Sequence, residues 1–264
     1  MAGGIVQWNC RGLRHKIDEI QLIIKDYNPT AFCVQETLLK EDESISIKNY
    51  TCYNNIPPIV NGKVSGGAGI LVRNDTPHTE LKLNTPLQVT AIQLNIQKQI
   101  TLCSIYIPPK SNLNQKDLDN LMKQLPSPYL ILGDFNAHNK LWGCSKNDKR
   151  GLTIEKFLDN HNLCYLNDKS PTHTDAKNLT SSAIDLSFCH PSLFLDFSWS
   201  VGDELYGSDH YPIFLDHSLA NEGRRLPRWQ LHRADWQQYS QLCQEQINKE
   251  TLLTSNNPIE SFTK

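Results

Sequence analysis

Short apolar runs, typical of buried strands, alternate along most of the chain with stretches whose apolar residues recur at helical spacing. The predicted strands cover residues 4–8, 30–35, 50–55, 69–73, 89–96, 100–107, 129–132, 163–166, 184–188, 194–199 and 211–215. The predicted helices cover residues 16–27, 113–125 and 150–160. Many strands with helices set between pairs of them favour an α+β fold of two stacked sheets flanked by helices.

The stretch YLILGDFNAHNKLWG at residues 129–143 is central to the chemistry. Its apolar start predicts a buried strand, and Gly133 is expected to end that strand by letting the backbone turn. Asp134 and Asn136 follow at strand spacing, so both side chains are expected on one side of the strand's end. The carboxylate can take a proton and the amide can hold an oxygen. A simple turn is the alternative interpretation, because Asp and Asn are favoured after strands.

Further stretches supply complementary polar groups, most of them at or near the ends of apolar runs. They are QWNCRG at 7–12, VQET at 34–37, SIYIP at 104–108, SAID at 182–185 and GSDHYP at 207–212. In this order they resemble the endonuclease/exonuclease/phosphatase family, which includes deoxyribonuclease I and the apurinic endonucleases. The extension AHNKLWG and the later FLDNHNLCYLND resemble the endonuclease domain of non-long-terminal-repeat retrotransposons of the jockey type. The resemblance covers about residues 4–217.

The resemblance implies a four-layer α-β-β-α sandwich that hydrolyses phosphodiesters. In it, Asp134 is the base that activates water, and Asn136 holds the nucleophile or a phosphate oxygen. His210 donates to a nonbridging phosphate oxygen as charge builds, and Asp185 orients its imidazole. Tyr106 binds the scissile phosphate or supports the leaving oxygen.

The resemblance also implies a metal site formed by Glu36 and Asn9, with Asp209 on the metal side. This oxygen-rich set suits Mg²⁺, or Mn²⁺, better than zinc. The polar segment 173–181 is expected to be a hairpin tip on the DNA-binding face. The residues expected to bind substrate are Thr172, Ser182, Ser208, Lys177 and Asn178.

Composition changes this picture little. The net charge is −2, so contacts to DNA must come from local basic patches. Eight cysteines without a CxxC pair favour reduced thiols, several of them in the core, and a reducing compartment. No signal peptide and no apolar run of membrane-spanning length are expected, which predicts a soluble, intracellular protein without a membrane partner. The resemblance to retrotransposon endonucleases implies that it acts in the nucleus.

Residues 1–220 are predicted to form the endonuclease domain, and residues 221–264 a basic linker and an amphipathic helix. In the retrotransposon polyproteins that the chain resembles, the corresponding segment leads toward the reverse transcriptase. The expected partner is therefore the reverse transcriptase region of a parent polyprotein, or a separate reverse transcriptase. The leading hypothesis is an endonuclease that nicks double-stranded DNA and leaves a 3′-hydroxyl to prime reverse transcription. The alternatives are an apurinic/apyrimidinic repair endonuclease and a catalytically inactive DNA-binding relic; the pattern does not reveal the oligomeric state.

Overall fold

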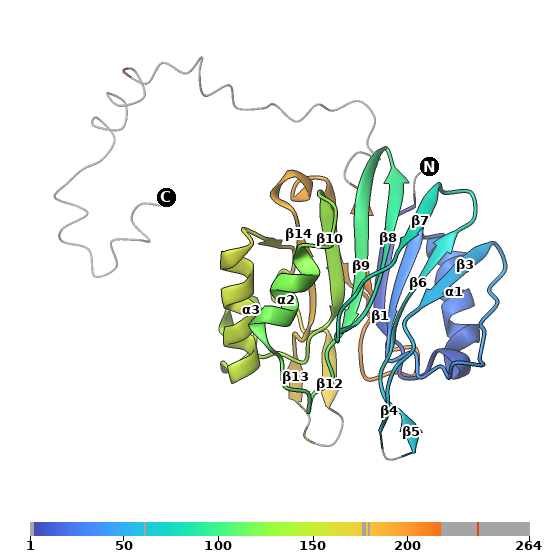
Figure 1. Cartoon of the computed structure of the whole chain (residues 1–264), viewed down its shortest axis with the longest axis horizontal. Helices are drawn as coiled ribbons and strands as arrows, with labels where there is room; N and C mark the ends of the chain where they lie inside the picture. The colour runs from blue at the N-terminus through green and yellow to red at the C-terminus, as the bar shows by residue number, and fades with distance from the viewer. Residues whose placement is uncertain (1–2, 61, 176–177, 179, 218–236, 238–264) are drawn as a thin grey trace. The chain divides into compact units, whose positions relative to one another are not determined.

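The computed structural model describes residues 3–60, 62–175, 178, 180–217 and 237. Two six-stranded sheets stand face to face, with helices on their outer sides (Figure 1). One compact unit spans Met1–Ala220. The linker and helix expected at 221–264 lie outside the described residues, apart from Gln237. Within the described part of the chain, no helix is long and apolar enough to cross a membrane.

The first sheet has the strand order β15-β16-β1-β2-β6-β3. Its strands are β1 (Ile5–Asn9), β2 (Ala31–Gln35), β3 (Tyr50–Asn54), β6 (Ala68–Arg73), β15 (Phe197–Val201) and β16 (Ile213–His217). β1 and β2 pair in parallel, and the short η1 (Leu13–Lys16) and α1 (Ile17–Tyr27) connect them. Asn28 ends α1 in a left-handed conformation, with its N–H bonded to the Ile24 carbonyl.

The second sheet has the strand order β11-β14-β10-β9-β8-β7. Its strands are β7 (His78–Leu81), β8 (Gln88–Ile96), β9 (Lys98–Tyr106), β10 (Tyr129–Asp134), β11 (Cys164–Tyr165) and β14 (Asp185–Cys189). β8 and β9 pair antiparallel along their whole length. β9 and β10 are parallel and α2 (Gln115–Met122) connects them, while α3 (Lys149–Asn160) follows β10.

Apolar side chains fill three layers. Between the sheets, residues such as Ile5, Cys33 and Val72 of the first sheet pack with Leu102 and Leu130 of the second. Each sheet also has one apolar cluster between it and the helices on its outer side. β1 and β2 are therefore buried on both faces, which explains their continuous apolar runs. The predicted four-layer α-β-β-α sandwich is confirmed.

Several local predictions were wrong. Gly133 does not end its strand: it lies inside β10, where a Cβ atom would meet the Ile105 carbonyl oxygen at 1.9 Å, so only glycine allows the close approach of β9. The strand expected from residue 194 begins only at Phe197, because the short helix η3 (Pro191–Leu193) precedes it and Leu195 is exposed. The strand β7 was not expected.

Two small hairpins extend from the same end of the sandwich (Figure 1). One consists of β4 (Ile59–Val60) and β5 (Lys63–Val64). The other consists of β12 (His173–Asp175) and β13 (Thr180–Ser182) and confirms the hairpin expected there. The parallel strands β9 and β10 also finish at this end, so the hairpins lie beside the polar strand ends.

Candidate active site

Four site residues lie where neighbouring strands finish. Asn9 is the last residue of β1, and Glu36 follows β2 directly. Tyr106 and Asp134 are the last residues of β9 and β10 and are paired in the register of these strands. The Asn9 amide donates to Asp134 Oδ2 at 2.9 Å and so joins the ends of the two sheets. The polar groups therefore meet where the two sheets end.

Asp134 is fully buried. Its Oδ1 accepts from the Asn136 backbone N–H, and its Oδ2 from the Asn136 side-chain amide, both at 2.9 Å. Asn136 has φ +46°, so a left-handed turn, and not strand spacing, brings the two side chains together. Burial and then the charge of Asp185 raise the pKa of Asp134 to about 7, although His210 opposes the shift.

His210 and Asp185 form a buried pair, with Nδ1 of the imidazole 2.8 Å from Asp185 Oδ2. The ring's Nε2 lies 4.0 Å from Asp134 Oδ2. Burial alone would lower the pKa of His210, but the carboxylates of Asp185, Asp134 and Asp209 raise it to about 9. The imidazole is thus held in its protonated form near neutral pH, with Nε2 directed toward the carboxylate expected to act as base.

The residues expected to hold the metal surround this pair. Glu36 adopts φ +50°, and its Oε1 accepts from the Asn9 amide at 3.2 Å and from the Tyr106 hydroxyl at 2.9 Å. Asp209 Oδ2 pairs with Arg11 at 3.0 Å, while its buried Oδ1 has no hydrogen-bond partner among the described residues. Glu36 and Asp209 each offer the carboxylate oxygens that Mg²⁺ prefers as ligands.

The Asn9 amide is oriented with its nitrogen toward the carboxylates. Its Oδ1 accepts from the Arg11 backbone N–H at 3.2 Å. To ligate a cation, the side chain has to turn its oxygen toward Glu36. In the observed arrangement the Asn9 amide nitrogen instead donates to both Glu36 and Asp134 and so links them.

The expected substrate-binding residues have different positions. Thr172 is fully buried, and its hydroxyl donates to Asp185 Oδ2 at 2.7 Å. The Ser208 hydroxyl donates to the Asn9 carbonyl at 2.7 Å, and Ser182 lies 3.2 Å from His173 Nδ1. The exposed Asn178 bonds to Asp175 within its hairpin, and Lys177 lies outside the described residues. Thr172 and Ser208 therefore hold Asp185 and the Asn9 backbone in position.

The structure also places residues at the site that were not predicted. His173 pairs with His210 through an antiparallel bridge, and the two ring centroids are 4.6 Å apart. The Trp8 indole donates to the His210 carbonyl at 2.9 Å. Arg150 donates to the carbonyls of Asn136 and Pro109 at 3.2 and 2.9 Å and so ties α3 to two loops at the site. His173 could have been predicted as a site residue from its position next to Thr172. Nothing in the sequence indicated that Arg150 lies at the site.

Fold and site together define the class: the chain has the deoxyribonuclease I-like fold of the endonuclease/exonuclease/phosphatase family. Among solved structures it is similar to the endonuclease domain of TRAS1, a telomere-specific non-LTR retrotransposon, with 20% identity and a TM-score of 0.69 over 82% of this chain and 98% of that one. It is also similar to an AP endonuclease from Archaeoglobus fulgidus, with 14% identity and a TM-score of 0.61 over 83% and 100%.

The sequence comparisons show similarity to proteins of transposons and mobile elements. A family model described as endonuclease-reverse transcriptase matches residues 100–214. The chain is 26% identical over 270 residues to a probable RNA-directed DNA polymerase from transposon BS of Drosophila melanogaster, covering 97% of this chain and 29% of the relative. It is 27% identical over 213 residues to the RNA-directed DNA polymerase from mobile element jockey of Drosophila funebris, covering 79% and 23%. The predicted resemblance to jockey-type retrotransposons is confirmed, and the chain spans about a quarter of the length of these relatives.

Proposed function

We propose that this chain is a Mg²⁺-dependent endodeoxyribonuclease that nicks double-stranded target DNA by phosphodiester hydrolysis. One observation carries the proposal: the Asp134–Asn136 turn and the Asp185–His210 pair, which come from distant parts of the sequence, meet in one buried network with Asn9. Such a network provides a base and a positively charged donor a few ångströms apart, which is the combination that phosphodiester hydrolysis needs.

The proposed chemistry follows from these positions. Asp134 accepts a proton from water, whose oxygen attacks the phosphorus. The bond from phosphorus to the 3′ oxygen breaks, and its electron pair stays on that oxygen, which then takes a proton from solvent. His210, charged and oriented by Asp185, donates from Nε2 to a nonbridging oxygen as charge builds there. A divalent cation held by Glu36 and Asp209, with Asn9 once its amide turns, would stabilise the leaving oxygen as a Lewis acid.

The proposed biological role depends on the polarity of the nick. A nick that leaves a 3′-hydroxyl and a 5′-phosphate can be extended at once by a reverse transcriptase, whereas a 3′-phosphate cannot. The similarity to transposon RNA-directed DNA polymerases supports a reverse transcriptase region as the partner and the nucleus as the place of action.

The test is to incubate supercoiled plasmid with the purified chain and Mg²⁺, with and without chelator. We expect chelator-sensitive nicking that Asp134→Asn and His210→Gln each reduce at least a hundredfold. His161→Gln is the matched control, because this histidine pairs with Asp119 away from the site. Circular dichroism checks that each variant is folded. An inactive wild-type chain would support the relic, and near-native nicking by either site variant would refute the assigned roles.

Two further measurements separate the remaining alternatives. A strong preference for an abasic duplex over intact DNA would identify a repair enzyme instead. Adding a DNA polymerase and labelled nucleotides to the nicked plasmid tests the polarity. Extension that needs prior phosphatase treatment would contradict both the polarity and the priming role.

A further inference from the structure

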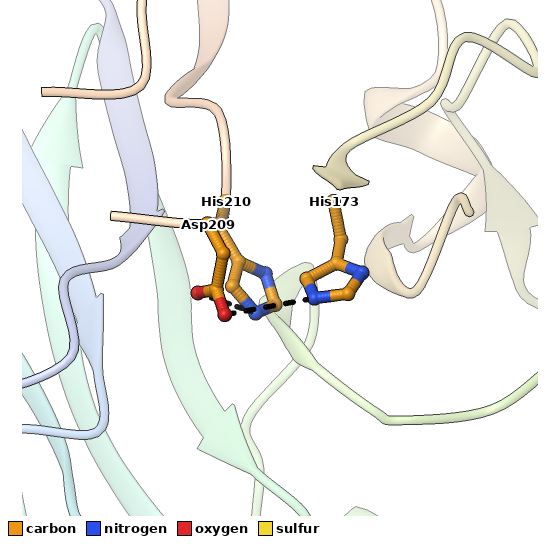
Figure 2. Close-up of side chains that lie close together, drawn as sticks. All are labelled: His173, Asp209 and His210. Atoms are coloured by element: carbon orange, nitrogen blue, oxygen red, sulfur yellow. Dashed lines mark ion pairs between the residues drawn. The ribbon is translucent and has the colours of Figure 1, made fainter. Parts of the chain in front are cut away.

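Two imidazoles and one carboxylate of the expected Mg²⁺ set lie close together: His173, His210 and Asp209 (Figure 2). Their ligand atoms all lie within 4.8 Å of one another. We propose that these three side chains bind a borderline-soft divalent cation such as Zn²⁺, and that its binding stops nicking. The second statement rests on the proposed function, whereas the first does not.

Both imidazoles present the same nitrogen to the carboxylate. His210 uses Nδ1 to bond Asp185 at 2.8 Å, and His173 uses Nδ1 to bond the Ser182 hydroxyl at 3.2 Å. Each Nε2 is left on the side of Asp209, in both cases 3.8 Å from a carboxylate oxygen. Histidines that ligate zinc typically hold the other ring nitrogen in a hydrogen bond of this kind, which fixes the ring. The cation displaces the proton that Nε2 of His210 otherwise carries.

The backbone fixes the three residues relative to one another. The Thr174 N–H bonds to the Asp209 carbonyl, and the Tyr211 N–H to the Thr172 carbonyl, both at 2.8 Å. His173 and His210 face each other in the bridge between these segments. The two 3.8 Å distances end on different oxygens of Asp209, Oδ2 for His173 and Oδ1 for His210. In a tetrahedral zinc site the ligand atoms are about 3.3 Å apart, so ligand atoms that lie within 4.8 Å of one another have to approach by up to about 1.5 Å, through side-chain rotation.

The carboxylate and its surroundings complete the donor set. Oδ1 of Asp209 is buried and has no hydrogen-bond partner among the described residues, which leaves a lone pair for a cation. The side chains of Asp209 and His173 remain 33% and 20% exposed, so water can reach the fourth position. Because Mg²⁺ prefers oxygen ligands, the two imidazoles select against it and favour zinc or cobalt.

Occupancy would remove two residues from the proposed mechanism at once. With Nε2 bound to the cation, His210 can no longer donate to the phosphate, and Asp209 is withdrawn from the Mg²⁺ side. Excess Mg²⁺ should relieve the inhibition only weakly, because it does not compete for imidazole nitrogens.

Binding is tested first, without reference to activity, by titrating the full chain with Co²⁺ and then displacing it with Zn²⁺. We expect the visible absorption of one Co²⁺ bound by nitrogen and oxygen ligands, without the intense near-ultraviolet band of thiolate ligands. His173→Gln should weaken the binding at least tenfold, and the control His161→Gln should leave it unchanged. Equal affinity in wild type and His173→Gln, or a thiolate band in both, would overturn the site.

Inhibition is tested by nicking with Mg²⁺ while Zn²⁺ is increased, each variant being compared with its own rate without zinc. The zinc concentration for half inhibition should rise at least tenfold in His173→Gln and not in His161→Gln. An unchanged value in His173→Gln would refute the inhibitory role. The wild-type chain could also bind Co²⁺ but nick no DNA. If His173→Gln then lost the Co²⁺ binding, the result would support the cation site and contradict the nuclease function.

Discussion

The hydroxyl of Thr172 should matter for both stability and rate, although it lies behind the site. It donates to Asp185 Oδ2 at 2.7 Å and accepts from the backbone N–H groups of Ile184 and Asp185 at 3.2 and 3.1 Å. Thr172→Val keeps the shape but removes all three bonds. A hydrogen bond to a charged group contributes about 1.5–3 kcal/mol, and a buried donor without a partner costs about 1–3 kcal/mol.

We therefore expect Thr172→Val to lower the free energy of unfolding by about 3 kcal/mol, since the effects overlap. At about 2–4 °C per kcal/mol, Tm falls by about 6–12 °C. At temperatures where the variant is folded, kcat should fall about 10- to 100-fold. Asp185 loses one of the two hydrogen bonds at its Oδ2 and therefore holds His210 less firmly. KM should change little, because the side chain is fully buried.

Urea denaturation and single-turnover nicking measure the two effects. Thr172→Ser is the matched control: it keeps the hydroxyl, loses one methyl group and should cost about 1 kcal/mol with little effect on kcat. A Val variant as stable as the Ser variant would show that the three bonds do not stabilise the fold. A destabilised Val variant with full kcat would limit Thr172 to a structural role and refute its positioning of Asp185.

Three further predictions follow from the site and the sheet. The pKa of His210 is raised from 6.5 to about 9, so its protonation stabilises the fold fully below pH 6.5, and this contribution is lost as pH rises to 9. The free energy of unfolding, measured by urea denaturation, should fall over this range, and Asp185→Asn should weaken that pH dependence. Gly133→Ala should destabilise by about 3 kcal/mol or more, because its Cβ meets the Ile105 backbone, and a Tm within 2 °C of wild type would contradict this. Replacing residues 176–179 with Gly-Ser should alter where the DNA is cut more than how fast, and an unchanged pattern of sequenced ends would refute this.

The sandwich could be predicted because its strands are buried on both faces. β1 and β2 are continuous apolar runs for this reason, and α1, α2 and α3 show regular helical spacing between strands. The strand β7 was missed because it is short and partly exposed, so no buried face imposes a pattern on it. Gly133 was misread because its role depends on β9, a strand that its own sequence neighbourhood does not reveal.

The candidate site shows a second limit, which concerns conformation. Arg11, Glu36 and Asn136 each follow a strand end and adopt φ values of +51°, +50° and +46°. This left-handed conformation costs about 1–2 kcal/mol for residues other than glycine, less for Asn. It is stabilised locally: the Glu36 carbonyl accepts from the Gly12 N–H at 2.8 Å, and the Asn136 N–H donates to Asp134 at 2.9 Å.

These turns fold the chain back at three strand ends, so that polar side chains meet where the two sheets end. A residue in the second position after a strand would otherwise continue outward into solvent, and Asn136 would not reach the carboxylate of Asp134. The motif residues are therefore visible in the sequence, whereas their convergence depends on backbone conformations that only the packed sheets enforce. The same reasoning explains His173, which reaches His210 only because its hairpin pairs with the segment before β16.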